Sequence, residues 1–426
     1  MPEFSYTLRN VMLGASLLGV MGGVVGTFAL LRRQSLLGDA LAHAALPGVC
    51  LAFLLTGQKS PPALLLGATL AGLAGALFIV VVVRWSRIKE DAAIGIVLSV
   101  FFAVGIVLLT RIQKLETGNQ SGLDKYLFGQ AATLVSDDLQ WMSIAGAVVL
   151  ITVGLFFKEF KLLAFDSAFG ASLGFPMRGI EVMLTCLLVV VVVVGLQTVG
   201  VVLMVAALIT PAAAARQWTD RLGIMVLLAA AIGGLSGAAG ALISASVARL
   251  PPGPTIVLVS SCALAVSLLF APRRGLLWAY VRERSVLARV RRENLLKDLY
   301  LMGERENGWS HFVSLAGLMG LRGQGAREIE RNARSLLREE LLEVSRDDDL
   351  RLTQAGLAEA QQVVRKHRLW ELYLTRRLEL PSDHVHRDAE GMEHALSEEA
   401  VAELEERLGF PQEDPHGRPI PPRLSS

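Results

Sequence analysis

Residues 35–56 read SLLGDALAHAALPGVCLAFLLT, an apolar stretch with one aspartate and one histidine inside it. A hydrocarbon core of about 30 Å is crossed by about 20 apolar residues in a helix, so this stretch is long enough to span a bilayer. Asp39 and His43 are four residues apart, which places both on one helix face. Ionisable side chains are costly in a membrane, and the pair is therefore a candidate transport site.

The chemistry of this pair favours a transition metal. A carboxylate oxygen and an imidazole nitrogen suit Mn, Fe or Zn better than Mg or Ca. Counting about 1.5 Å of rise per residue from Arg33 places His43 roughly 15 Å deep, near the midplane. Pro47 and Gly48 would permit a bent or unwound helix with carbonyls available to an ion. The structural alternative is an interhelical hydrogen bond between Asp39 and His43 that holds a helix bundle together.

Further runs of bilayer length surround this stretch. The complete set is 8–31, 35–56, 61–83, 92–110, 138–157, 180–216, 222–248 and 254–271. The run 180–216 is too long for one ordinary span, and Gly195, Gln197 and Gly200 near its centre predict two short spans or a broken helix. We therefore expect an all-α polytopic membrane protein with about nine transmembrane helices.

Basic residues mark alternate loops of this arrangement. They are Arg32 and Arg33; Arg84, Arg87 and Lys89; Lys158 and Lys161; Arg216 and Arg221; and Arg273 and Arg274. An excess of Lys and Arg indicates the cytoplasmic side. With nine crossings and an outside N-terminus, the C-terminal segment is then cytoplasmic.

Composition changes after Pro272. Residues 273–426 hold 25 of the 41 Lys and Arg and 27 of the 39 Asp and Glu, so this part is charged and slightly acidic. Its periodicity predicts helices at 276–303, 310–321, 326–343, 354–379 and 397–408, with a hairpin around Asp347 to Asp349. This element order is that of a winged helix-turn-helix followed by a helical region.

We predict four parts along the chain. Residues 1–272 form the membrane domain, 273–289 a juxtamembrane helical linker, 290–353 a winged-helix-like region, and 354–426 a mostly helical C-terminal region. Histidine is concentrated in the last part, which has five of the seven in the chain. His367 and Glu371 are i and i+4, whereas Glu390, Glu393 and His394 are i, i+3 and i+4, so each set can point ligands in one direction. The alternative is a solvated, charged helix face.

Four segments of the membrane half resemble the permease family of manganese, zinc and iron ABC importers. They are SLLGDALAHAALPG (35–48), FDSAFGASLGFP (165–176), VGVVLMVAALITPAAAAR (199–216) and LPPGPTIVLV (250–259). The resemblance implies a bacterial plasma (inner) membrane location and a dimeric pore formed with a second permease copy or a paralogue. It also implies an extracytoplasmic metal-binding protein that delivers the ion, and a metal-holding role for Asp39 and His43 in the translocation path.

The same resemblance implies that an ABC ATPase docks on the segment 165–176. The predicted docking residues are Phe165, Asp166, Ala168, Gly170 and Gly174. The chain has no GxxxxGK[ST] phosphate loop, so its own sequence offers no ATP-binding motif. We expect a transporter subunit and no enzyme, with ATP hydrolysed by a separate subunit.

Three segments of the C-terminal part resemble the metal-sensing and dimerisation region of the diphtheria-toxin-repressor and manganese-repressor family. They are LTQAGLAEAQQVVRKHRLWELYL (352–374), HRDAEGMEHALS (386–397) and DPHGRPIP (414–421). By this resemblance, one metal site comprises His367, Glu371 and His386, and the other comprises Glu390, Glu393 and His394. A carboxylate at 390, where iron-responsive members commonly have cysteine, favours Mn over Fe.

Two positions depart from the family pattern. Asn294 and Lys297 stand where the family supplies Met, Asp or Glu ligands, and a protonated lysine cannot ligate a metal. The corresponding site is therefore incomplete, weaker or rearranged.

The leading hypothesis is a permease subunit that imports manganese, with zinc or iron as alternative cargo, and whose cytoplasmic domain senses the same metal. Membrane lipid surrounds the predicted membrane domain. In the alternative, the C-terminal domain represses transcription, tethered or after proteolytic release. The region 326–341 mixes Arg327, Arg331, Arg334 and Arg338 with Glu328, Glu330, Glu339 and Glu340, and these acids would repel phosphates. Binding to DNA is therefore disfavoured.

Overall fold

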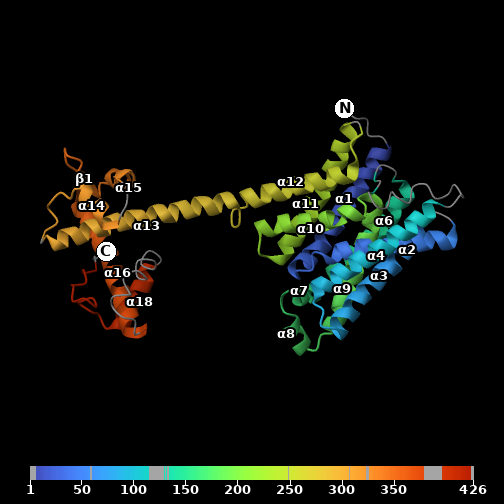
Figure 1. Cartoon of the computed structure of the whole chain (residues 1–426), viewed down its shortest axis with the longest axis horizontal. Helices are drawn as coiled ribbons and strands as arrows, with labels where there is room; N and C mark the ends of the chain where they lie inside the picture. The colour runs from blue at the N-terminus through green and yellow to red at the C-terminus, as the bar shows by residue number, and fades with distance from the viewer. Residues whose placement is uncertain are drawn as a thin grey trace. The chain divides into compact units, whose positions relative to one another are not determined.

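The computed structural model describes residues 6–57, 60–114, 129, 131, 134–247, 249–306, 308–322, 326–378 and 396–423. Within these residues the chain divides into two compact units, Met1–Ala279 and Tyr280–Ser426 (Figure 1). The first is a bundle of long apolar helices. The second combines charged helices with one small hairpin.

Nine helices among the described residues are long and apolar enough to cross a membrane. They are α1 (Tyr6–Leu31), α2 (Leu37–Thr56), α3 (Pro61–Trp85), α4 (Glu90–Gln113), α6 (Ser136–Leu155), α9 (Met177–Thr198), α10 (Val201–Trp218), α11 (Leu222–Ser246) and α12 (Pro252–Phe270). The predicted all-α membrane fold with about nine spans is confirmed.

The long apolar run 180–216 is two helices. α9 ends at Thr198 and α10 begins at Val201, with Gly200 between them at φ 86° and ψ 167°. An L-residue with a side chain rarely adopts this conformation, so glycine is the residue that permits the break. The interpretation as two short spans is confirmed.

Helices α2 and α3 pack with their backbones close together. A Cβ atom built on Gly48 would lie 2.1 Å from the carbonyl oxygen of Gly67, and one built on Gly67 would lie 2.5 Å from the carbonyl oxygen of Gly48. Glycine is needed at both positions because any side chain would separate the helices. Of the two possibilities predicted near Pro47, a bent or an unwound helix, the unwound one is wrong: α2 is continuous through this residue, and Gly48 permits close packing.

This contact predicts a large loss of stability on substitution. We expect Gly67→Val to lower the melting temperature of the detergent-solubilised protein by at least about 5 °C, because overpacking costs about 1–3 kcal/mol or more. Gly95→Ala is the matched control, since a Cβ there meets nothing within 4 Å. Equal melting temperatures for Gly67→Val and the wild type would contradict the packing argument.

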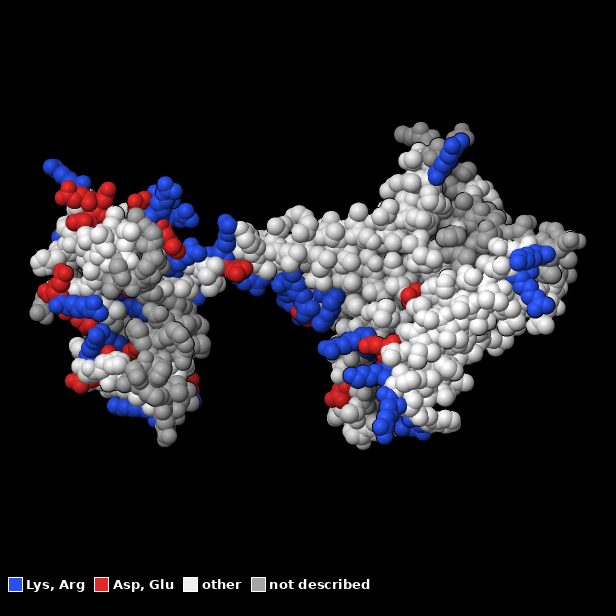
Figure 2. Space-filling model, in the orientation of Figure 1, with Lys and Arg blue, Asp and Glu red and all other residues white. Residues whose placement is uncertain are grey.

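Ion pairs and hydrogen bonds join the loops at the helix ends. Arg32, after α1, pairs with Glu181 of α9, and Gln34 donates to Glu90 of α4 at 2.6 Å. Asp220, between α10 and α11, lies 2.6 Å from Arg274 and 3.6 Å from Arg216. These contacts form two groups among the loops predicted to be cytoplasmic, one around Arg32 and one around Asp220. Figure 2 shows charges near helix ends beside largely uncharged flanks.

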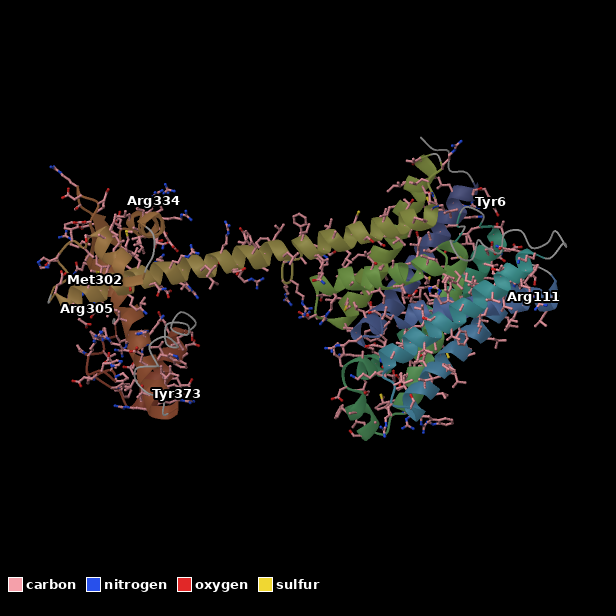
Figure 3. The ribbon with its side chains drawn as sticks, viewed as in Figure 1. Tyr6, Arg111, Met302, Arg305, Arg334 and Tyr373 are labelled. Atoms are coloured by element: carbon pink, nitrogen blue, oxygen red, sulfur yellow. The ribbon has the colours of Figure 1, made fainter. Side chains whose placement is uncertain are left out.

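The second unit has the predicted element order. Its elements are α13 (Leu276–Arg305, which begins before the unit boundary), α14 (Leu315–Arg322), α15 (Ala326–Arg338), β1 (Leu342–Val344), β2 (Leu350–Leu352), α16 (Gln354–Leu378) and α18 (Glu398–Leu408). Met302 and Arg305 mark the last turn of α13 (Figure 3). β1 and β2 are antiparallel, with Glu343 opposite Arg351, and Val313 forms a further bridge to Leu350.

Two boundaries differ from the prediction. The helix expected over 310–321 begins only at Leu315. The helix expected over 326–343 ends at Arg338, because Glu340 adopts φ 58° and Leu342–Val344 pair as a strand. The buried side chains Leu296, Leu336, Leu350 and Val364 bring α13, α15, the hairpin and α16 into one core. The hairpin is therefore part of the folded unit.

Candidate metal centre

Asp39 and His43 lie on one face of α2 and contact each other. Nε2 of His43 is 3.5 Å from Oδ1 of Asp39. The side chain of His43 is 12% exposed and that of Asp39 is 26% exposed, so the carboxylate is the more accessible group. Pro47 has no N–H with which to bond the carbonyl oxygen of His43, which adds an oxygen atom at the same turn. These are suitable donors for a divalent transition metal.

The pair lies nearer one end of its helix than the sequence suggested. A turn separates α1 from α2, with Arg33 in the left-handed conformation at φ 60°, and α2 starts only at Leu37. His43 is six residues from that start, or about 9 Å along the helix axis. The count from Arg33 assumed a continuous helix and was too long by the residues in the turn. Asp39 lies in the first turn of α2, where the helix dipole favours a negative charge.

The surroundings of His43 leave part of the imidazole unsatisfied. The ring of Phe102, on α4, meets the imidazole edge to face at 4.7 Å between ring centres. Nδ1 of His43 is buried and has no hydrogen-bond partner among the described residues. Those residues also contain no group of three or more His, Cys, Asp or Glu side chains that could hold a metal. Within the described part of one chain, the pair provides two side-chain ligands, fewer than a typical site requires.

The segment predicted to dock an ATPase forms two short helices, α7 (Phe157–Phe165) and α8 (Ser167–Ser172). Asp166 caps α8 by accepting a hydrogen bond from the amide of Phe169 at 2.8 Å. Gly170 is buried, and a Cβ there would lie 2.7 Å from Sδ of Met177. Gly174 adopts φ 86° and ends the segment. Asp166, Gly170 and Gly174 therefore shape the segment.

The exposed side chains of this segment are mainly apolar. We call them the α8 patch: Phe165, Phe169, Leu173 and Phe175, all largely exposed. Of these four, the sequence reasoning singled out Phe165 alone. Phe169 and Leu173 are four residues apart along α8 and its C-terminal cap, and this helical spacing is the signal that could have identified these two.

In the second unit, His367 and Glu371 form a buried pair on α16. Nε2 of His367 lies 3.1 Å from Oε1 of Glu371, and their side chains are 5% and 4% exposed. Two ligands of one ion with bonds of about 2.1 Å at right angles are about 3 Å apart, so the donors are suitably placed for one metal. Their burial excludes the alternative of a solvated helix face at these two positions. The other predicted ligands, His386, Glu390, Glu393 and His394, lie outside the described residues.

The two departures from the family pattern are also within the core region of this unit. Lys297 is 1% exposed, and Oδ1 of Asn294 is buried with no hydrogen-bond partner among the described residues. An ammonium group cannot donate an electron pair to a metal. Lys297 therefore does not fit as a metal ligand, whereas the donors of His367 and Glu371 do.

Arg368, adjacent to His367, connects three parts of the second unit. It donates to both carboxylate oxygens of Glu304 on α13, at 3.1 and 2.6 Å, and to the carbonyl of Pro419 at 2.5 Å. Asp414 lies 3.5 Å from its Nε. Sequence reasoning did not identify this residue, because its partners are far away along the chain. The metal-ligand helix α16 is thus joined to α13 and to the C-terminal segment.

Charges of both signs lie on α15 and just after it. Glu328, on α15, lies 3.7 Å from Arg291, and Glu339, just after α15, lies 2.6 Å from Arg292, so two of the four acids of 326–341 pair with α13. The exposed residues include Arg327, Arg331, Arg334 and Arg338, and Figure 3 shows Arg334 on α15. Glu330, Glu339 and Glu340 are exposed as well, and Glu330 lies 3.7 Å from Arg334. The exposed side of this region therefore carries charges of both signs, as the sequence indicated.

Comparison with known proteins identifies both parts of the chain. Residues 5–271 match the ABC 3 transport family, and residues 353–422 match the iron dependent repressor metal binding and dimerisation domain. The chain belongs to the ABC 3 transport family. Both predicted family resemblances are confirmed, and this ABC 3 protein is a multi-pass membrane protein.

Named relatives of this ABC 3 protein are metal transport proteins. It is 46% identical over 370 residues to the manganese transport system membrane protein MntC of Bacillus subtilis, covering 87% of this chain and 84% of the relative. It is 50% identical over 281 residues to the zinc transport system membrane protein TroC of Treponema pallidum, covering 66% and 94%. A solved structure, PsaBC from Streptococcus pneumoniae in complex with Fab, matches with a TM-score of 0.58 and 33% identity, covering 66% of this chain and 96% of that chain.

Proposed function

We propose that this chain is the membrane-spanning permease subunit of an ABC importer for a divalent transition metal, and that manganese is the principal cargo. The observation on which this rests is the Asp39–His43 pair on a membrane-spanning helix, with Nε2 and Oδ1 3.5 Å apart and Nδ1 unsatisfied. The named manganese and zinc transport relatives support a metal as cargo. Zinc and iron are the alternatives, because these ligand types bind all three ions.

A second permease copy, or a paralogue, would complete the metal site. Two protomers related by a two-fold axis each supply one carboxylate and one imidazole, which makes four side-chain ligands. The greater exposure of Asp39 supports this arrangement, because the carboxylate can reach beyond its own chain. An extracytoplasmic metal-binding protein would deliver the ion to this dimer.

We place the ATPase partner on the α8 patch. The patch is apolar and exposed, Asp166 and Gly170 hold its conformation, and apolar residues exposed at a helix end are suited to a protein interface. The chain has no ATP-binding phosphate loop of its own, so ATP hydrolysis belongs to this partner.

The patch provides a prediction about assembly. We expect Phe169→Asp to weaken ATPase binding by at least about 30-fold, since an interface anchor contributes about 2 kcal/mol or more. Binding would be measured by co-purification and by titration of the detergent-solubilised permease with the ATPase. Ser172→Asp is the control, because it introduces the same charge at an exposed polar residue of α8, the helix that contains Phe169. Undiminished binding by Phe169→Asp would reject this docking site.

We propose that the second unit is cytoplasmic and regulates transport by binding the imported metal. The buried His367–Glu371 pair supplies two donors, and Arg368 joins its helix to α13 and to the segment around Asp414. Metal bound to the pair would therefore stabilise one arrangement of this unit. Differential binding between two states is the physical requirement for such feedback.

A second candidate function for this unit is DNA binding, which the exposed arginines of α15 favour. Arg327, Arg331 and Arg338 could contact phosphates, because Glu328 and Glu339 are paired with α13, whereas Arg334 is paired with Glu330. Retention of a labelled operator that depends on both metal and salt would support this function. Weak binding without sequence preference would reject it.

The proposed transport function is tested by reconstitution. Vesicles that contain the permease, its ATPase partner and the extracytoplasmic binding protein should accumulate ⁵⁴Mn²⁺ in the presence of ATP. Competition by unlabelled Mn²⁺, Zn²⁺ and Fe²⁺ then ranks the cargo ions. Absence of ATP-dependent accumulation of all three metals would contradict the proposal.

A further inference from the structure

The metal-ligand helix α2 is attached to α1 by a short, hydrogen-bonded turn. The amide of Arg32 donates to Phe28 O at 3.0 Å, the amide of Gln34 donates to Ala29 O at 3.0 Å, and the amide of Leu37 donates to Gln34 O at 3.1 Å. Asp39 is only seven residues beyond Arg32. A displacement of this turn must therefore move the start of α2 and its first-turn carboxylate.

The segment that bears the α8 patch packs directly against the end of α1. The rings of Phe157 and Phe160, on α7, lie 6.3 and 5.6 Å from the ring of Phe28. Phe28 and Phe160 are fully buried. Close-packed aromatic side chains transmit displacement, because the interior has little free volume. Motion of α7 is thus coupled to the last turns of α1.

A polar contact joins the same turn to the helix that follows the patch. Arg32 donates a hydrogen bond to Glu181, on the second turn of α9, and the side chain of Arg32 is only 14% exposed. α9 begins at Met177, whose sulfur packs against Gly170 of α8. A largely buried guanidinium needs an anionic partner, so the turn must follow Glu181 when α9 moves.

The turn has a third contact on its other side. Nε2 of Gln34 donates to Oε1 of Glu90, in the first turn of α4, at 2.6 Å. This bond is between neutral and charged groups at an exposed site, whereas the Arg32–Glu181 bond is an ion pair with a largely buried cation. The stronger restraint on the turn is therefore the one that leads to the docking segment.

We propose that the Arg32–Glu181 ion pair is a coupling element, which transmits movement of the ATPase-docking segment to the α1–α2 turn and so repositions Asp39 and His43. This inference rests on the proposed function, because it requires both the docking site and the metal pair. Arg32 and Glu181 act as positioning residues and do not touch the metal. The Phe28, Phe157 and Phe160 contacts provide the apolar part of the same connection.

The test compares transport with ATP hydrolysis in the reconstituted complex of full-length permease, ATPase and binding protein. For Glu181→Gln we expect the number of ⁵⁴Mn²⁺ ions accumulated per ATP hydrolysed to fall about tenfold, in keeping with coupling between residues in contact. ATPase binding and basal ATP hydrolysis should stay near wild-type values. A role in folding alone would reduce assembly and hydrolysis together with transport.

Two further variants make the test specific. The exchange Arg32→Glu with Glu181→Arg should restore most of the coupling, because it rebuilds an ion pair between the same elements. Glu90→Gln is the matched control: it removes a carboxylate charge at the same turn but keeps an oxygen to accept from Gln34, and coupling should be unchanged. Wild-type coupling in Glu181→Gln, or failure of the exchange to restore coupling, would overturn the inference.

The same assay separates this inference from the proposed function. If Asp39→Asn blocks uptake while Glu181→Gln remains fully coupled, only the coupling element is rejected. If Asp39→Asn also transports normally, the proposed metal path is rejected.

Discussion

Asp39→Asn and His43→Ala are each expected to reduce ATP-dependent ⁵⁴Mn²⁺ uptake by about 100-fold or more, because even groups that only support metal ligands contribute about 10- to 100-fold to metal affinity. Asp39→Asn removes the negative charge that offsets the cost of bringing a dication into the membrane. His43→Ala removes the nitrogen donor and the ring that contacts Phe102. Both are measured in reconstituted vesicles at a fixed internal ATP concentration.

Asp137→Asn is the control for this experiment. Asp137 occupies the first turn of α6, as Asp39 occupies the first turn of α2, but it is exposed and far from the pair in sequence. Its uptake should match that of the wild type. Melting temperatures of all three variants show whether the fold is retained. Normal uptake by both Asp39→Asn and His43→Ala would mean that the pair only holds helices together.

The second large effect concerns regulation by the C-terminal unit. Deletion of 285–426 should preserve uptake. It should also raise, by about tenfold, the internal Mn²⁺ concentration at which the uptake rate is halved, which is within the usual range of allosteric coupling. His367→Ala and Glu371→Gln should have the same effect, because each removes one donor of the buried pair. The measurement is initial uptake rate into vesicles preloaded with graded Mn²⁺.

Glu403→Gln is the matched control for the regulatory variants. Glu403 is an exposed carboxylate of α18 that pairs with Arg407, so its substitution removes an acid from the same unit without affecting a buried donor. Uptake by the Glu403→Gln variant should be inhibited at the same internal Mn²⁺ concentration as uptake by the wild type. If the deletion and both donor variants are inhibited at wild-type Mn²⁺ concentrations, the proposed feedback is rejected.

Local pattern was sufficient for the order of the elements. The helices of the second unit begin and end within a few residues of the predicted positions, with two exceptions. α14 begins at Leu315, five residues late, and α15 ends early because residues 342–344 join a hairpin. A charged, helix-forming segment can still pair as a strand when a neighbouring strand and a buried core are available. The periodicity of one segment contains no information about a neighbouring strand, so the end of α15 could not be predicted from it.

The site residues also fall into two groups, those that local spacing predicted and those that it did not. Asp39, His43, His367 and Glu371 were predicted because residues four apart share a helix face, and the structure places each pair within 3.5 Å. By contrast, Arg368 and the Arg32–Glu181 pair depend on which helices pack together. Their partners are 64 and 149 residues away in the chain. Local spacing rules relate residues within a turn or two of one helix, so they could not predict these contacts.

The sequence by itself determined the apolar spans, nine among the described residues, the break within 180–216 and the two-residue ligand pairs, because hydrophobic length and helical periodicity act within one segment. Tertiary structure decided that α2 is unbroken at Pro47, that Glu328 and Glu339 pair with α13, and that the α1–α2 turn is joined to the docking segment. These features arise from close packing between helices that are distant in the chain, which depends on the complete set of side-chain shapes and charges.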